Sequence, residues 1–211
     1  MKRPTPPAVG LESTTLGILR GVYVANLRDG RATLGAVSRG LGADPSSVRA
    51  ALRDASKKKL LRLTKGSAEL TPEGRRRLKV VLLGGAFEII HPGHVEALSE
   101  AKRIGNTLVV VVATDESVEK NKGRPPVTDQ SSRVGLVSAL RQVDVALPGN
   151  KGSIYDILLK IRPDVVALGY DQRLDGDEVV REAARRGVKI TTARLGSAIP
   201  LVKTTKILFS M

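Results

Sequence analysis

The sequence has no cysteine and no tryptophan among its 211 residues. The absence of cysteine excludes disulfide bonds, thiolate metal sites and a cysteine nucleophile. With only two Phe and three Tyr, any ring that stacks on a ligand must come from a short set. Long apolar runs are also missing: the longest aliphatic run, LVVVVA at 108–113, is far too short to span a membrane. The start, MKRPTPPAVG, lacks the apolar stretch of a signal peptide. We therefore expect a soluble cytoplasmic protein that makes no use of a membrane.

Acidic residues are scarce in the first third of the chain. Residues 1–79 hold 17 Lys and Arg against 6 Asp and Glu, a net charge of +11. Residues 80–211 hold 18 against 15, a net charge of only +3. This asymmetry indicates a polyanionic partner for the first part.

The first segment has a helical rhythm followed by a hairpin. Its apolar spacing predicts two helices over 16–30 and 32–42, and Pro45-Ser46-Ser47 is typical of the start of a third. LLRLT and AELT, separated by Lys65-Gly66-Ser67, predict a hairpin, and a short helix follows Thr71. This order predicts a winged helix-turn-helix domain over 1–77. The segment ELTPEGRRRL resembles the end of the wing in many archaeal and bacterial winged-helix domains.

The expected recognition helix, 46–58, and the wing carry cations that could contact DNA phosphates. These residues are Arg49, Arg53, Lys57 and Lys58 on the helix, and Arg62 and Lys65 on the wing. One hypothesis is therefore a DNA-binding regulator that uses the rest of the chain as a nucleotide or flavin sensor. The alternative is a domain that only packs on an enzyme or helps it to dimerise, because winged helices are widely reused.

The second segment alternates aliphatic strands with helices. The strands are expected at 79–85, 107–114, 143–149, 164–171 and 188–196. Continuous apolar strands separated by helices predict a parallel sheet covered on both faces. The fold class is thus α/β, a Rossmann-like, doubly wound, five-stranded parallel sheet over 78–211. Ligands of such sheets bind at the carboxyl ends of the strands.

Both histidines of the chain lie in GGAFEIIHPGHVEAL, residues 84–98, directly after the first of these strands. His91 and His94 should project from a helix N-terminus, where backbone N–H groups and the helix dipole already favour anions. Glycines here let a nucleotide approach the backbone. The alternatives are a loop that happens to hold two histidines, or a metal pair with Glu88 as the third ligand.

This stretch resembles the signature of the cytidylyltransferase-like nucleotidyltransferases, with HxGH at the start of the first helix. The resemblance implies that the imidazoles stabilise charge on the departing pyrophosphate while the acceptor's phosphate attacks the nucleotide α-phosphorus, with no covalent intermediate. His91 and His94 become catalytic candidates. The nucleotide-binding candidates in the same stretch are Gly84, Gly85, Ala86, Phe87 and Gly93.

Three further stretches agree with this resemblance. ATDESVEKNKGRPPV, 113–127, resembles a family loop whose cations hold the acceptor's phosphate; taken alone it would be a solvated basic loop. The acceptor-phosphate candidates are Lys120, Lys122, Arg124 and, on the next helix, Arg133, with Lys122 also a catalytic candidate. LGYDQ resembles a family turn that contacts the base and ribose of the nucleotide, and taken alone its Asp could be a turn or helix cap. LVKTTKI resembles a family motif at the start of the last helix that contacts the nucleotide's phosphates, and taken alone it is a capped helix. They add Gly169, Asp171, Thr204, Thr205 and Lys206.

Within the family, IIHPGHVEAL, KGRPPV, LGYDQ and TTKI resemble the archaeal FAD synthetases most. This implies transfer of AMP from ATP to FMN, with Mg²⁺ carried by ATP and a homodimer compatible with the fold. Glu88 stands where the family usually has Asp, and one more methylene moves the carboxylate. The alternative is a CTP-dependent cytidylyltransferase acting on glycerol 3-phosphate or phosphoethanolamine, because the motifs read phosphate and ribose rather than base.

Overall fold

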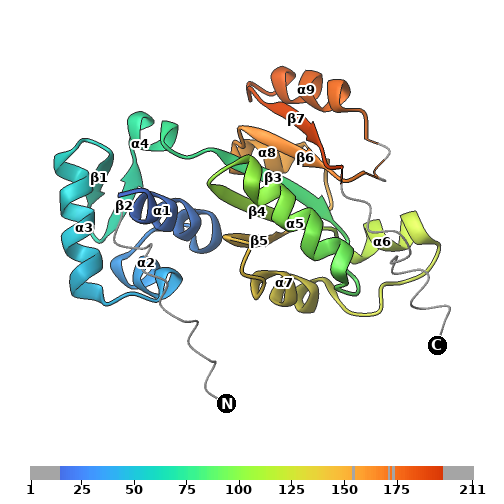
Figure 1. The fold of residues 1–211 in the computed structure, drawn as a ribbon, viewed down its shortest axis with the longest axis horizontal. Coiled ribbons are helices and arrows are strands. Elements are labelled where there is room, and N and C mark those ends of the chain that lie inside the picture. The colour runs from blue at the N-terminus through green and yellow to red at the C-terminus, as the bar shows by residue number, and fades with distance from the viewer. Residues whose placement is uncertain (1–14, 154, 171, 173, 197–211) are drawn as a thin grey trace, which may run out of the picture. The chain divides into compact units, whose positions relative to one another are not determined.

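The computed structural model describes residues 15–153, 155–170, 172 and 174–196. Contacts divide the chain into two compact units, Met1–Leu78 and Lys79–Met211 (Figure 1). The first unit has the order helix, helix, helix, hairpin, helix. Its elements are α1 (Thr15–Asp29), α2 (Leu34–Leu41), α3 (Pro45–Lys57), β1 (Leu61–Thr64), β2 (Ser67–Leu70) and α4 (Pro72–Arg76).

Local sequence explains where the elements of the first unit begin and end. The Thr33 hydroxyl accepts from the Ala36 N–H and caps α2, and Gly42, with φ of 62°, ends it. The Asp44 carboxylate accepts from Ser46 and Ser47 and caps α3. At Gly74 a Cβ would stand 2.0 Å from the carbonyl oxygen of Leu60, the residue before β1, so α4 can pack this closely only with glycine there. These local features set the bounds of α2 and α3 and the packing of α4.

The second unit is a five-stranded parallel sheet, as the sequence predicts, and its strand order is β5-β4-β3-β6-β7. Its strands are β3 (Val80–Gly85), β4 (Thr107–Val112), β5 (Val145–Pro148), β6 (Val165–Leu168) and β7 (Thr191–Arg194). Its helices are α5 (Pro92–Ile104), α6 (Asp115–Lys122), α7 (Gln130–Ser138), α8 (Asp156–Ile161) and α9 (Gly176–Arg185). Each strand is shorter than the run that predicted it: β3 begins one residue later, and β7 loses three residues at its start and two at its end.

The strand order places a topological switch beside β3. The chain runs from β3 outward to β4 and β5, and then crosses to β6 on the other side of β3. Beneath this edge, side chains such as Val81, Leu83, Leu98 and Val110 form the apolar core. Ligands of doubly wound sheets bind in the crevice at such a switch, outside the carboxyl ends of the strands. Gly85 and Leu168 mark that place here.

The segment after β4 differs from the sequence-based expectation of a loop. Residues Asp115–Lys122 form α6, capped by the Thr114 hydroxyl, which accepts from Ser117 N at 3.1 Å, and ended by Gly123 with φ of 70°. A threonine before two acidic residues and a glycine after two lysines are the ordinary start and stop signals of a helix. Lys120 and Lys122 therefore lie on the last turn of a helix.

Candidate active site

The two histidines meet at the start of α5. His91 is the N-cap residue with extended backbone and no side-chain capping bond, and Pro92 opens the helix. The rings of His91 and His94 stack with centroids 3.8 Å apart and planes at 28°. The ring of Phe87 lies 5.2 Å from that of His94. The structure thus brings both imidazoles together at the carboxyl end of β3, where the helix dipole favours an anion.

The ring of Phe87 packs directly against the backbone of Gly85. Phe87 has φ of 50°, unusual for a residue with a side chain, and its ring is buried in the core. A Cβ on Gly85 would stand 2.8 Å from that ring. The space at Gly85 is therefore filled by the ring of Phe87, which is buried and contacts the ring of His94. At Gly84 a Cβ would meet nothing closer than the Val111 carbonyl oxygen at 4.0 Å, so the open approach predicted for the glycine pair belongs to Gly84.

Glu88 is buried with its charge fully engaged. The Lys122 ammonium and the Arg124 guanidinium each donate to the carboxylate at 2.5 Å, and the Val127 N–H donates at 3.0 Å. The Glu88 side chain is 0% exposed, whereas those of Lys122 and Arg124 are 29% and 38% exposed. This carboxylate, which the sequence also suggested as a metal ligand, accepts hydrogen bonds from two cations.

The pKa of Glu88 follows from these contacts. Burial by itself raises the pKa, but hydrogen bonds from Arg124, Lys122 and the Val127 N–H outweigh it and lower the pKa to about 2. Glu88 is therefore ionised at neutral pH, and the three side chains together carry a net charge of +1.

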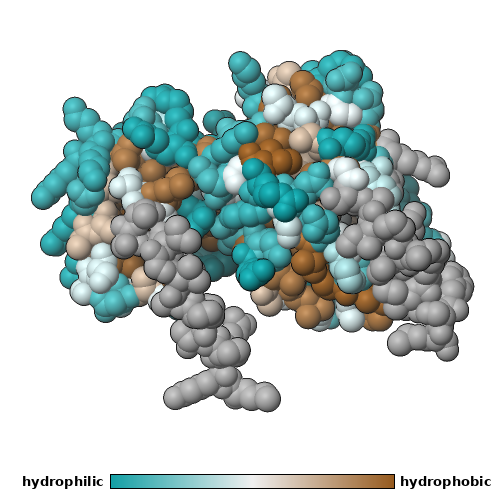
Figure 2. Space-filling model, in the orientation of Figure 1, coloured by the Kyte–Doolittle hydropathy of each residue, from teal (hydrophilic) through white to brown (hydrophobic). Residues whose placement is uncertain are grey.

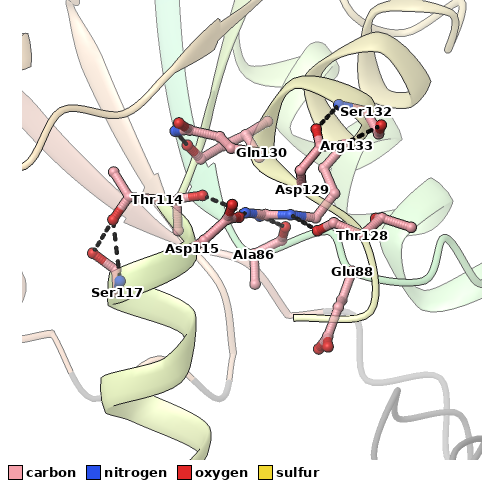
Figure 3. Close-up of polar contacts among 12 residues, drawn as sticks. Ala86, Glu88, Thr114, Asp115, Ser117, Thr128, Asp129, Gln130, Ser132 and Arg133 are labelled. Carbon is pink, nitrogen blue, oxygen red and sulfur yellow. Dashed lines mark hydrogen bonds and ion pairs between the residues drawn. The ribbon is translucent and has the colours of Figure 1, made fainter. Parts of the chain in front are cut away.

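Arg133 has a different place from the one predicted. Its side chain is 0% exposed and donates to the carbonyl oxygens of Thr128, Ala86 and Ala113 and to the Asp115 carboxylate (Figure 3). All three guanidinium nitrogens thus donate to acceptors of the protein itself. The prediction that Arg133 reaches the acceptor's phosphate is wrong, because the side chain points inward and braces the loop after β3 against the segments around α6 and α7.

Two glutamines that sequence reasoning missed join strand ends. Gln130 donates through Nε2 to the carbonyl oxygens of Val112 and Gly149, at 2.9 and 3.0 Å. Gln172 donates to the Gly84 carbonyl at 2.8 Å and accepts from the Gly169 N–H at 3.0 Å. Gln172 therefore spans the switch between β3 and β6. Its place inside LGYDQ was the only sequence signal.

Arg194, also missed, fixes the turn after β6. It donates to the carbonyl oxygens of Gly169, Gln172 and Leu174 at 2.7–3.0 Å. Arg194 is the last residue of β7, so three neighbouring strand ends are joined at this edge. Four predicted site residues lie outside the described part of the chain: Asp171, Thr204, Thr205 and Lys206.

In the described part of the chain, no three His, Asp or Glu residues are grouped so as to hold a metal ion. No helix described by the structure is both long and apolar enough to cross a bilayer. What the edge of the sheet does gather is a stacked imidazole pair, two partly exposed cations and a helix N-terminus. These groups suit a phosphorylated ligand.

Fold and site together define a nucleotide-binding α/β unit of the HxGH class. A sequence profile described as cytidylyltransferase-like matches residues 82–207, and the chain belongs to this family. It is 43% identical over 115 residues to an FAD synthase of Aciduliprofundum boonei, covering 54% of this chain and 76% of that protein. It is 42% identical over 121 residues to an FAD synthase of Pyrococcus horikoshii, covering 57% and 81%.

A solved structure shares the fold. The crystal structure of the lipopolysaccharide core biosynthesis protein from Thermoplasma volcanium superposes with a TM-score of 0.55 at 36% sequence identity. The match covers 57% of this chain and 98% of that chain.

Proposed function

We propose that the chain is an FAD synthase, a nucleotidyltransferase that moves AMP from ATP to FMN and releases pyrophosphate. The observation that carries this proposal is the identity of 42–43% with archaeal proteins named FAD synthase, over three quarters or more of their length. The stacked histidines at the carboxyl end of the central strand support the same reaction class.

The reaction needs positioning and charge neutralisation rather than covalent catalysis. An oxygen of the FMN phosphate attacks the α-phosphorus of ATP in line, and the bond from that phosphorus to the α–β bridging oxygen breaks. Pyrophosphate leaves with the electron pair of that bond. His91 and His94 donate N–H groups to the phosphate oxygens on which charge develops, and the N-terminus of α5 adds its dipole.

The acceptor's phosphate is held by cations from the end of α6. Lys122 and Arg124 are both partly exposed, and both are fixed on one buried carboxylate. Lys120, two residues earlier on the same helix, is exposed and is a further candidate for this contact. Gly169 and the turn braced by Gln172 and Arg194 are candidates for contact with the nucleotide.

Magnesium enters this account as part of the substrate MgATP. The described residues offer no cluster of carboxylates and imidazoles that would form a protein cage. The metal bound to ATP would neutralise the phosphates and the leaving group.

The test is a screen in which purified protein receives ATP or CTP, magnesium and one acceptor at a time. The readout is the pyrophosphate that is released. The acceptors are FMN, glycerol 3-phosphate, phosphoethanolamine and 4′-phosphopantetheine. We expect release with ATP and FMN, together with FAD. Release only with CTP and a small phosphate would support nucleotidyl transfer but contradict ATP and FMN as the substrates. No release with any pair would contradict the proposal.

A second function is favoured by the outer face of α3. Val48, Leu52 and Ala55 face inward and are buried, while Arg49, Arg53 and Lys57 are exposed. In Figure 2 the left rim, where Figure 1 places α3, is mostly teal, with some tan and white areas. The acidic Asp54 is already paired with Lys58 at 2.7 Å. We therefore propose that the first unit binds nucleic acid through α3, with the hairpin cations Arg62 and Lys65 as additional phosphate contacts.

Duplex DNA is the form of nucleic acid that suits this helix. The 13 residues of α3 make a rod about 20 Å long and about 10–12 Å wide, which the major groove of B-DNA admits. The deep and narrow major groove of A-form RNA does not admit it. The order of α2, the turn at Gly42 and α3 is that of a DNA-binding helix-turn-helix motif.

The matched variants are R49A/R53A/K57A on α3 and R141A/K160A/K189A on exposed positions of the second unit. Both remove three positive charges. Fluorescence anisotropy with a short labelled duplex should show weaker binding for the first variant only, and its slope of log affinity against log salt should fall by about 1 per removed contact. Equal binding by both variants would overturn this second function, and stronger binding to duplex RNA would replace its partner.

A further inference from the structure

Glu88 is a buried charge that the reaction itself does not use. Its side chain is 0% exposed, and both oxygens accept hydrogen bonds: Oε1 from Arg124 and the Val127 N–H, Oε2 from Lys122 and, at 3.3 Å, from Arg124. The side chains of the two cations are partly exposed, whereas that of Glu88 is not. A buried carboxylate with this many donors is fully satisfied.

Lys122 and Arg124 have more N–H donors than their bonds within the protein use. A lysine ammonium has three donors and a guanidinium has five. Lys122 gives one N–H to Glu88, and Arg124 gives two to Glu88 and one to the Pro125 carbonyl. With 29% and 38% of their side chains exposed, both can also donate outward. The two cations repel each other, and the negative charge of the carboxylate to which both donate offsets that repulsion.

The position of Glu88 in the chain joins two parts of the site. Glu88 lies three residues before His91, on the loop that leaves β3. Lys122 ends α6, and Arg124 follows the Gly123 that terminates the helix. One buried side chain therefore sets where these cations stand relative to the histidine loop.

We propose that Glu88 is the positioning residue of the acceptor-phosphate site: it holds Lys122 and Arg124 side by side so that both contact the phosphate of the acceptor. This inference rests on the proposed function and goes beyond it, because it assigns the strength of phosphate recognition to a side chain that touches no substrate. It also explains the longer side chain at this position. A glutamate reaches both cations, whereas an aspartate, shorter by one methylene, would reach them less well.

The test compares two ligands that differ by the phosphate alone. FMN and riboflavin share the flavin, so quenching of flavin fluorescence gives an equilibrium Kd for each without catalysis. In E88Q the carboxylate charge is gone while the size is kept. We expect the Kd of FMN to rise about ten- to a hundredfold and the Kd of riboflavin to stay the same. E88D should give an intermediate Kd for FMN, and the KM of ATP should not change in either variant.

A matched control removes another paired carboxylate. Asp144 is 14% exposed, binds Lys102, and accepts from the Leu108 N–H at the amino end of β4, the opposite edge of the sheet. D144N should leave the Kd of FMN unchanged. If E88Q does not fold, E88D alone serves the same measurement, because it keeps the carboxylate and withdraws it by one methylene from Lys122 and Arg124.

The outcomes separate this inference from the proposed function. Wild-type protein that binds FMN, with E88Q equal to it, overturns the inference alone. A rise in Kd shared equally by FMN and riboflavin shows a merely structural role and also overturns it. Wild-type protein that binds no FMN overturns the proposed function, and the inference falls with it.

Discussion

Glu88 and Arg133 are the charged side chains that the structure buries among the described residues. Both hold the loop after β3. Arg133 donates to the Ala86 carbonyl of that loop, and Glu88, which is part of the loop, accepts from Lys122. A buried charge persists only when it is paired and hydrogen-bonded. At the scale of single residues, this pair holds the loop that carries the histidines.

Replacing Arg133 tests the brace. R133M leaves the carbonyl oxygens that now accept from the guanidinium without a donor, so the free energy of unfolding should fall by about 3 kcal/mol. The control is R103M, at an arginine that is 66% exposed and paired with Glu96, where a change within about 0.5 kcal/mol is expected. Urea denaturation of both variants gives the comparison, and equal losses would contradict a bracing role.

The pH dependence of stability should show the charge of Glu88. Its pKa lies at about 2 in the folded protein, below the ordinary 4.5. The ionised group therefore stabilises the fold above pH 4.5, and this contribution is lost as pH falls from 4.5 toward 2. The difference in unfolding free energy between wild type and E88Q, measured in urea at several pH values, should shrink across that window. A constant difference would mean that Glu88 is not ionised in the folded state.

At the scale of elements, the carboxyl edge of the sheet is held by side chains that bridge strand ends. Gln130 joins β4 to β5, Gln172 joins β6 to β3, and Arg194 joins β7 to the turn after β6. The apolar rhythm of the sequence predicted the strands. It could not predict these bridges, because they join residues up to 88 positions apart.

The bridge at Gln172 should set nucleotide affinity. Q172A removes the bonds to the Gly84 carbonyl and the Gly169 N–H, so the turn that is a candidate for nucleotide contact is no longer held at β3. We expect the KM of ATP to rise roughly tenfold, as for the loss of one or two hydrogen bonds, with the KM of FMN unchanged. Q142A, which removes a single bond to Ser99, is the control. Equal KM values for ATP in wild type and Q172A would show that this turn does not position the nucleotide.

At the scale of the whole chain, the sequence patterns predicted the α/β class and the five parallel strands, because buried parallel strands read as unbroken aliphatic runs. They also placed His91 and His94 at a helix start. They failed at α6, where resemblance to a loop outweighed ordinary capping signals, and at Arg133, where nothing local distinguishes an arginine that points inward. The sequence shows which residues carry charge, whereas burial depends on the packing of distant segments.

The charge asymmetry is a further property of the whole molecule. The first 79 residues carry a net charge of +11 and the rest +3. The affinity for nucleic acid and the rate of FAD formation should therefore depend differently on salt concentration. Affinity for duplex DNA should fall steeply between about 50 and 200 mM salt. FAD formation, which depends on contacts inside a partly buried site, should be less sensitive. Parallel salt titrations of the two activities would show this, and identical salt dependence would argue against separate surfaces.

The most direct measurement of the central claim is FAD formed from MgATP and FMN by wild type and by H91A/H94A, with far-UV circular dichroism as the check of folding. Wild type should form FAD and one pyrophosphate per FAD. The folded double variant should be slower by a factor on the order of a hundred or more, because the N–H donors for the developing charge are gone. A folded double variant that forms FAD at the wild-type rate would contradict the mechanism.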